Sequence, residues 1–271
     1  MTASPVSPMP GAMQQETADA ERRFGGLRRL YGAAGYQRLR EASVAVVGLG
    51  GVGSWAVEAL ARSGLRQLVL IDFDQVAESN INRQVQALGA TIGMAKGEAL
   101  RQRIADIHPQ CDVVVVDEFA TPQNWPALLP VPVDAVIDAC DQGQAKLALA
   151  SWALAHQVGL VCCGAAGGKQ GADQIEMADL AEVTHDPLLA TLRQRLRKAG
   201  APRSGPIGLP CVFSRESVAP PADALCDSDG TLNCHGYGSS VAVTATAGMV
   251  AAGEVLRQIA SGGWRRQKFG C

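Results

Sequence analysis

A glycine-rich turn joins an apolar strand to a helix, and it constrains the fold of this chain more than any other feature. Residues 44–60 read VAVVGLGGVGSWAVEAL. The apolar run at its start predicts a buried strand, and helical spacing begins at Val52. The turn between them fits G-x-G-x-x-G and contains Gly48, Gly50, Gly51 and Gly53. Such a turn brings backbone N–H groups and a helix N-terminus to a phosphate, so it predicts a nucleotide site without choosing the nucleotide.

Apolar runs and helical patterns alternate along the first part of the chain. Runs such as LVLI and CDVVVV lack polar alternation, as is typical of parallel strands covered on both faces. We expect strands at 44–48, 67–71, 113–117, 133–137 and 159–163, and helices at 52–63, 94–107 and 143–157. The expected fold is α/β: a doubly wound, Rossmann-like, mostly parallel sheet with helices on both faces and a C-terminal extension. Its ligand is expected beyond the carboxyl ends of the strands.

The length of 271 residues suits one large domain between two tails. We expect a disordered tail at 1–20, a single domain at 21–261 and a C-terminal tail at 262–271. Within the domain, a nucleotide-binding core covers about 40–165 and a substrate, RNA and dimer region about 166–261. That second region begins with a long loop and contains a basic helix near 186–198. It ends in a helix near 237–259 that Glu254 and Arg257 interrupt, so we expect this helix to be buried or at an interface and not to span a membrane.

The net charge and the cysteine content constrain the expected partners and the expected cellular compartment. The net charge of −2 provides no global field for nucleic acid, so any such contact has to be local. Eight cysteines without a recognisable secretory signal predict reduced thiols in the cytoplasm.

Polar side chains follow the second expected strand, in the segment LVLIDFDQVAESNINRQ. Asp72 ends that strand about 20 residues after the glycine turn, where a carboxylate can bind a ribose diol. The polar residues that follow it are Asp74, Asn80, Asn82, Arg83 and Lys96. Two cations beside a glycine turn suit a triphosphate better than a pyrophosphate that backbone N–H groups already hold. Taken singly, Arg83 or Lys96 is equally consistent with a solvated helix face.

Two carboxylates, Asp138 and Asp141, follow a third strand in VDAVIDACDQ. Asp141 opens the next helix and is consistent with a simple N-cap. It also emerges at the same edge of the sheet as the glycine turn and Asp72. A carboxylate beside a triphosphate favours Mg²⁺, which bridges phosphate oxygens.

Together these elements resemble one superfamily. GLGGVGS, DFDQVAESNINRQ, Lys96 and DACDQ resemble the adenylating enzymes related to ubiquitin-activating enzyme and to the molybdopterin-synthase and thiamine-biosynthesis adenylyltransferases. Other segments resemble the tRNA threonylcarbamoyladenosine dehydratases within it: RFGGLRRLYG at 23–32, GAAGG at 164–168, DPLLATLRQRLRK at 186–198, CVFSRE at 211–216 and GYGSSVAVTATAG at 236–248.

The resemblance implies that ATP and Mg²⁺ activate a carboxylate as an acyl-adenylate, with release of pyrophosphate. In the dehydratases, this carboxylate belongs to the threonine moiety of a modified adenosine beside the tRNA anticodon. The carbamoyl group then displaces AMP and closes a ring, with net loss of water.

Matching positions imply a role for each expected site residue. The glycine turn would bind phosphate, Asp72 the ribose, and Asp141 the magnesium. Arg23 matches an arginine that reaches into the site of a neighbouring subunit, which implies a homodimer. The implied catalytic residues are Arg83, Lys96, Asp141 and Arg23. The implied ATP-binding residues are Gly48, Gly50, Gly51, Gly53, Asp72, Asp74, Asn80, Asn82, Arg83, Lys96 and Asp141.

Cysteine and histidine residues add no catalytic candidate. Many relatives bind structural zinc through two C-x-x-C pairs, which this sequence lacks, so we expect no zinc of that kind. Cys211 and Cys234, the latter beside His235, are each consistent with a reactive thiol or with a small buried apolar residue. Neither is counted as catalytic. None of the other histidines has a partner that indicates a general base.

A local basic cluster is the candidate RNA-binding site, and it contains Arg193, Arg195, Arg197 and Lys198. On a helix, Leu188, Leu189, Leu192 and Leu196 form a separate apolar face. A charge run is usually a solvated face, but the resemblance favours contact with tRNA phosphates.

Two other functions remain open. An adenylating activator of a small sulfur-carrier protein would use the same ATP site and would bring a sulfur-transfer protein as a partner. The absence of C-x-x-C pairs disfavours it. A nicotinamide-binding oxidoreductase or nucleotide-sensing module rests on the glycine turn alone, and the polar cluster from Asn80 to Lys96 disfavours it.

Overall fold

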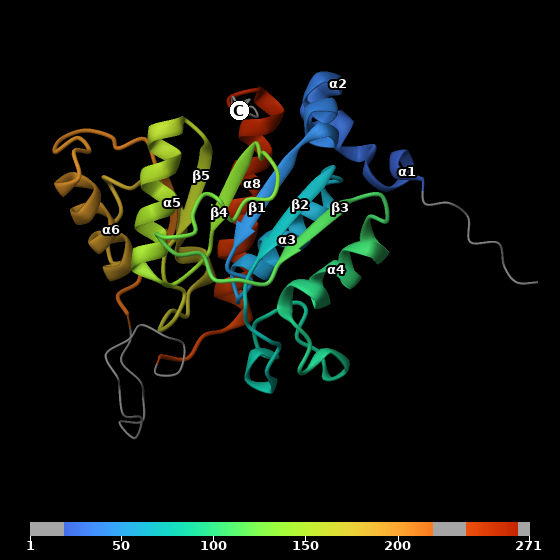
Figure 1. The fold of residues 1–271 in the computed structure, drawn as a ribbon, viewed down its shortest axis with the longest axis horizontal. Helices are drawn as coiled ribbons and strands as arrows, with labels where there is room; N and C mark the ends of the chain where they lie inside the picture. Colours follow the sequence, from blue (N-terminus) through green and yellow to red (C-terminus); the bar gives the residue numbers. More distant parts are fainter. Residues whose placement is uncertain (1–18, 219–236, 265–271) are drawn as a thin grey trace, which may run out of the picture.

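A seven-stranded sheet forms the centre of the molecule (Figure 1). The computed structural model describes residues 19–218 and 237–264. The sheet order is β3-β2-β1-β4-β5-β7-β6. The strands are β1 Ser43–Val47, β2 Gln67–Ile71, β3 Asp112–Val116, β4 Ala135–Asp138, β5 Gly159–Cys163, β6 Ile175–Asp179 and β7 Pro210–Ser214. Six of them run parallel and only β6 is antiparallel, against β7. The expected doubly wound, mostly parallel α/β fold is therefore confirmed.

The strand order reverses beside β1. In register, Val44 of β1 pairs with Leu68 of β2 on one side and with Ala135 of β4 on the other. Crossovers leave β1 in opposite directions, so the carboxyl ends of β1 and β4 open a crevice between them. This is the position where ligands bind in open α/β sheets.

Two strands were not expected from the sequence. The segment after Gly164 was interpreted as a long loop, yet it contains β6, and β7 follows the basic helix. The sequence of β6, IEMAD, has no continuous apolar run, and this edge strand is half-buried. The other edge strand, β3, is also only half-buried and not covered on both faces as expected, yet its run of four valines identified it.

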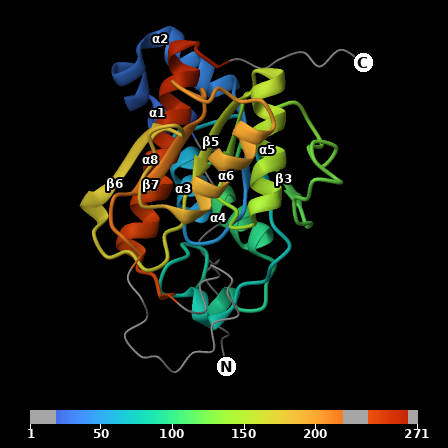
Figure 2. The ribbon, with the colours of Figure 1, turned by 90° about the vertical axis from the view of Figure 1, so that its left-hand side faces the viewer.

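Helices cover both faces of the sheet. They are α1 Ala20–Phe24, α2 Gly26–Glu41, α3 Gly53–Arg62, α4 Lys96–Ile107, α5 Gly143–His156, α6 Pro187–Lys198 and α8 Val241–Ser261. Three short 3₁₀ helices are η1 Glu78–Asn80, η2 Gly89–Thr91 and η3 Ala172–Gln174. In β1, Val44 and Val46 pack under α3 and α8, while Ala45 and Val47 pack under α5 and α6. Figure 2 shows α8 and α5 on opposite sides of the sheet.

From the sequence, the helix near 237–259 was expected to be either buried or at an interface. Helix α8 packs in the core of its own chain. Ala251, Ala252 and Val255 are fully buried in it. At Gly248, an added Cβ would lie 2.4 Å from the carbonyl oxygen of Val52, so glycine permits the close approach of α8 to α3. Within the described ranges, no helix combines the length and apolar character needed to cross a bilayer.

Candidate functional site

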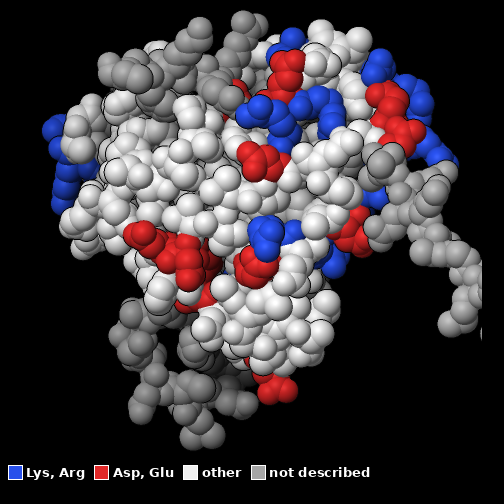
Figure 3. Space-filling model, turned by 45° about the vertical axis from the view of Figure 1, so that its right-hand side comes forward, with Lys and Arg blue, Asp and Glu red and all other residues white. Residues whose placement is uncertain are grey.

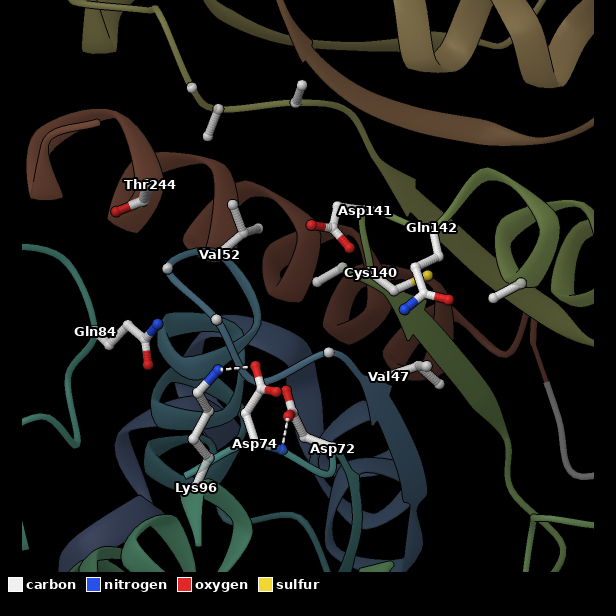
Figure 4. Close-up of a pocket in the computed structure, with 18 of the residues that line it drawn as sticks. Val47, Val52, Asp72, Asp74, Gln84, Lys96, Cys140, Asp141, Gln142 and Thr244 are labelled. Atoms are coloured by element: carbon white, nitrogen blue, oxygen red, sulfur yellow. Dashed lines mark hydrogen bonds and ion pairs between the residues drawn. The ribbon is translucent and has the colours of Figure 1, made fainter. Parts of the chain in front are cut away.

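A cavity of about 440 Å³ opens at the carboxyl edge of the sheet, where β1 and β4 part. Nine of the eleven expected ATP-binding residues line it: Gly48, Gly50, Gly51, Asp72, Asp74, Asn80, Arg83, Lys96 and Asp141. Figure 4 shows Asp141 and Gln142 across the cavity from Lys96, Asp72 and Asp74. Segments distant in sequence thus meet at the predicted edge.

The glycines of the turn serve different purposes. Gly48 has φ of 88°, and Gly53 lies so close to Gly48 that an added Cβ would be 1.8 Å from the Gly48 carbonyl oxygen. Both are needed for the turn itself, which explains why Gly53 supports the cavity without lining it. At Gly50 an added Cβ would meet no atom within 4 Å. Gly50 therefore leaves open space at the N-terminus of α3, where backbone can approach a ligand.

Asp72 is a buried carboxylate that holds the turn. Its oxygens accept hydrogen bonds from the backbone N–H of Leu49 at 2.6 Å and of Asp74 at 2.8 Å. Burial raises the pKa of Asp72, while Lys96 and these two N–H groups oppose that rise. A carboxylate offers about four acceptor positions, so two remain for hydroxyl donors of a ligand.

Lys96 is buried at the start of α4 and faces the cavity (Figure 4). Its Nζ lies 2.7 Å from Oδ2 of Asp74, whose side chain is 52% exposed. A cation held by one exposed carboxylate can be transferred to phosphate oxygens with little loss of ion pairing.

The segment between β2 and α4 supplies the remaining polar groups. Arg83 donates from Nη1 to the carbonyl oxygen of Ser79 at 2.7 Å and to Oδ1 of Asn82 at 2.9 Å. Asn82 does not line the cavity; its amide donates to the carbonyl oxygen of Ser239 at 2.9 Å. The buried Asn80 accepts from the N–H of Ala77, which fixes η1. Asn82 therefore positions Arg83 and the segment before α8, and Asn80 shapes the wall.

The two carboxylates after β4 have different environments. Asp138 is fully buried and forms an ion pair of 2.9 Å with the equally buried Lys146 of α5. Asp141 is exposed in the cavity and its carboxylate has no hydrogen-bond partner among residues 19–218 and 237–264. The N-cap of α5 is Gln142, so the simple N-cap interpretation of Asp141 is wrong.

Sequence reasoning missed several lining residues because they carry no chemical pattern. Glu118, Phe119 and Ala120 follow β3 and line the cavity. The Phe119 ring lies 5.4 Å from that of Phe73, and both rings are exposed. The loop after β5 also contributes; it was identified only through the resemblance of GAAGG, and its residues Gly164 to Gly167 line the opposite wall.

Arg23 lies far from the cavity of its own chain. It donates to the carbonyl oxygens of Asp106 and Ile107 at 2.8 and 2.6 Å, at the C-terminal end of α4. Because Lys96 begins the same helix of 12 residues, the two ends are about 18 Å apart. Arg23 therefore caps α4 within the chain and cannot serve the same chain's cavity from this position.

The basic helix α6 has the expected apolar face, with all four leucines buried. A surface groove of about 510 Å³ is lined by Ala190, Arg193, Gln194, Arg197, Lys198 and Arg203. In it, the Nε of Arg197 is buried and has no hydrogen-bond partner among the described residues. Arg195 lies apart, with Nη1 donating to the carbonyl oxygen of Gly143 at 3.4 Å. The face drawn in Figure 3 carries acidic and basic side chains interspersed.

The five described cysteines are buried or half-buried. Burial raises the pKa of Cys111 and Cys163 to about 12, so these thiols are poor nucleophiles. Cys211 is fully buried in β7, and Cys234 and His235 lie outside the described residues. In the part of the chain that the structure describes, no three His, Cys, Asp or Glu side chains form a metal-binding group.

Comparison with known proteins identifies the family of this chain. The model of the ThiF family matches residues 24–267. The tRNA threonylcarbamoyladenosine dehydratase of Escherichia coli is 42% identical over 249 residues, covering 88% of this chain and 93% of that protein. The chain belongs to the ThiF family, in its tRNA threonylcarbamoyladenosine dehydratase branch.

Solved structures of the E. coli dehydratase agree with this ThiF-family assignment. The structure in complex with ATP has a TM-score of 0.81 and 40% identity, and the alignment covers 91% of this chain and 97% of that chain. The structure in complex with AMP has a TM-score of 0.82 and 41% identity at the same coverage. ATP and AMP are thus both ligands of a ThiF-family relative.

Proposed function

We propose that this ThiF-family chain is an ATP-dependent dehydratase that cyclises threonylcarbamoyladenosine beside the tRNA anticodon. The observation that carries the proposal is the cavity, which joins the glycine turn, the buried carboxylate of Asp72 and the two cations Arg83 and Lys96. The ATP and AMP complexes of the E. coli relative support it. An oxidoreductase would have no use for Arg83 and Lys96 at this place.

The geometry supports catalysis by positioning and charge stabilisation. The glycine turn and the N-terminus of α3 hold phosphate, and Asp72 accepts from the ribose hydroxyls. Arg83 and Lys96 bind the phosphates that leave as pyrophosphate, with Lys96 released from Asp74. The substrate carboxylate then attacks the α-phosphorus and pyrophosphate departs. The carbamoyl group next attacks the acyl carbon and AMP leaves, so no protein nucleophile is needed.

Asp141 fits a magnesium ion bound through ATP. Mg²⁺ prefers one or two protein carboxylates together with phosphate oxygens and water. Asp141 offers one exposed carboxylate that no described protein group engages. The ion would neutralise charge as pyrophosphate leaves.

The groove along α6 is the proposed contact for the tRNA backbone. It gathers Arg193, Arg197, Lys198 and Arg203, and the buried Nε of Arg197 lacks an acceptor among the described residues. Phosphate oxygens would supply that acceptor. Arg195, over the start of α5, would contact RNA nearer the ATP cavity.

A homodimer is the proposed assembly. Arg23 lies about one helix length from its own cavity, so a catalytic role for it requires the cavity of a second copy. Exposed apolar side chains in the segments after β2 and β3 are suited to such an interface: Phe73, Ile81, Leu88, Ile92 and Phe119.

We place the protein in the cytoplasm, where ATP and tRNA are available. The sulfur-carrier alternative is not favoured, since the E. coli relative is a dehydratase. A sulfur-transfer partner has no support from the five described thiols, all buried or half-buried.

Incubation with ATP, Mg²⁺ and tRNA that carries the linear modification tests the function. Mass spectrometry of the nucleosides is expected to show loss of one water, and ATP but not NAD is expected to raise the melting temperature. Unchanged nucleosides, or stabilisation by NAD alone, would overturn the proposal.

A further inference from the structure

The loop after β5 contains two backbone N–H groups that no described residue engages. Ala166 and Gly167 line the ATP cavity. Neither of their N–H groups has a hydrogen-bond partner within residues 19–218 and 237–264. Buried backbone donors are rarely left without a partner; these two residues are half-buried, at the wall of a cavity. Two adjacent donors without a described partner on this wall make it a candidate site for an anion.

The rest of this loop is held firmly. The N–H of Ala165 donates to Oδ2 of Asp186 at 2.8 Å, and Asp186, 3% exposed, also caps α6. At the other end, the N–H of Gly171 donates to Glu216 at 2.8 Å. Lys169, 3% exposed, donates from Nζ to the carbonyl oxygens of His185 and Glu216. The two free N–H groups thus lie on a preorganised loop, which is the arrangement that makes backbone donors effective in a site.

The sheet order places this loop on the side from which a nucleophile has to approach. Asp72 follows β2, the glycine turn follows β1, Asp141 follows β4, and the loop follows β5. Arg83 and Lys96, which would hold the leaving pyrophosphate, both come from the β2 side. Phosphoryl transfer requires attacking and leaving oxygens roughly in line. The attacking carboxylate therefore has to enter from the β4 and β5 side.

The described residues that line the cavity on that side carry no positive charge; Arg195, outside the lining, donates to the carbonyl oxygen of Gly143. The lining residues there are Ala139, Cys140, Asp141, Gln142, Ala145, Gly164, Ala165, Ala166, Gly167 and Leu188. None of these is lysine or arginine, and Asp141 is negative. Backbone N–H groups are the donors that remain close to the required position, together with the amide of Gln142.

We propose that the N–H groups of Ala166 and Gly167 bind the carboxylate of the substrate and stabilise its oxygen during adenylation. The inference rests on the proposed function. It adds the subsite for the reacting group, which is a carboxylate on a nucleoside side chain.

The test replaces single backbone N–H groups by ester oxygens. Lactic acid is introduced in place of Ala166 by nonsense suppression, and alanine introduced by the same route is the reference. The matched control is lactic acid in place of Ala172, whose N–H also lacks a described partner but lies outside the cavity. ATP–pyrophosphate exchange that depends on modified tRNA reports adenylation, and calorimetry reports ATP affinity.

The ester at 166 is expected to lower kcat/KM for tRNA in the exchange by about tenfold or more, with ATP affinity unchanged and the ester at 172 without effect. An unchanged exchange rate at 166 would overturn the inference. So would a parallel loss of ATP affinity, because the N–H would then bind the nucleotide. Failure of the reference protein to exchange pyrophosphate at all would instead refute the proposed function.

Discussion

The ammonium of Lys146 lies 2.9 Å from the carboxylate of Asp138, and both side chains are fully buried. Lys146 also donates to the carbonyl oxygen of Cys163 at 2.9 Å, so it joins the ends of β4 and β5 beneath the cavity. Asp138 in turn accepts from the N–H of Cys140, at the start of the segment that carries Asp141. Attraction within the pair keeps Lys146 charged and raises its pKa although burial opposes this.

Removing one partner of the Asp138–Lys146 ion pair is expected to destabilise the fold. Lys146→Met leaves a buried carboxylate unpaired and is expected to lower the free energy of unfolding by about 3–5 kcal/mol. The double variant Asp138→Asn, Lys146→Met removes both charges and is expected to recover part of that loss. Urea denaturation measures both. A double variant less stable than Lys146→Met would contradict the interpretation.

Two glycines of the turn are expected to respond differently to alanine. Gly50→Ala meets no protein atom within 4 Å, so stability without ligand should be unchanged while ATP affinity falls about tenfold as the methyl fills the phosphate position. Gly53→Ala places a methyl against the Gly48 carbonyl oxygen and should destabilise the fold. Melting curves with and without ATP distinguish the two. A drop in ligand-free melting temperature for Gly50→Ala equal to that of Gly53→Ala would show that Gly50 is structural.

Removing a charged side chain from the proposed triphosphate site is expected to abolish adenylation while the fold stays intact. Arg83→Ala, Lys96→Ala and Asp141→Ala should each lower ATP–pyrophosphate exchange by about 100-fold or more. For Asp141→Ala the melting temperature should not change, since its carboxylate has no partner among the described residues. Near-normal exchange by this variant would remove Asp141 from the magnesium site.

Complementation tests the shared site. Arg23→Ala and Asp141→Ala are each expected to be inactive alone. Mixed, they should regain part of the activity, because one cavity of the mixed dimer has an intact Asp141 and receives Arg23 from the other subunit. Subunit exchange is verified by mass spectrometry of labelled chains. Exchange without recovered activity would exclude the shared site, as would a monomer in sedimentation.

Acid stability is expected to depend on His108. Burial, with nearby Arg40 and Arg23, lowers the pKa of His108 from 6.5 to about 4. Because the folded chain disfavours the charged ring, the stability contributed by neutral His108 is complete above pH 6.5 and is lost as the pH falls toward 4. His108→Gln removes this titration and should lose less stability over that interval. Urea curves at pH 7 and pH 4.5 compare the proteins, and equal losses would show that other groups account for the acid sensitivity.

The sequence predicted the nucleotide half of the molecule better than the remainder. Strands β1 to β5 all appear as continuous apolar runs, and β1, β2, β4 and β5 are fully buried, so their positions were found within a residue or two. The half-buried β6 had no such run. The carboxylates Asp138 and Asp141 look alike in sequence, and the buried ion pair with Lys146 distinguishes the structural Asp138 from the proposed magnesium ligand Asp141. The donors of Ala166 and Gly167 belong to the backbone, which no side-chain pattern reveals.

Because the strand order reverses beside β1, the two walls of the cavity come from strands that pair on opposite sides of β1 during folding. A partly folded chain in which β1, β2 and β3 have paired already holds the glycine turn, Asp72 and Lys96. It lacks Asp141 and the loop after β5 until β4 and β5 have docked on the other side of β1. Under the proposed function, ATP contacts residues on both sides of β1, so it would bind the completed sheet best and favour that state by mass action. ATP is therefore expected to stabilise the docking of β4 and β5 on β1.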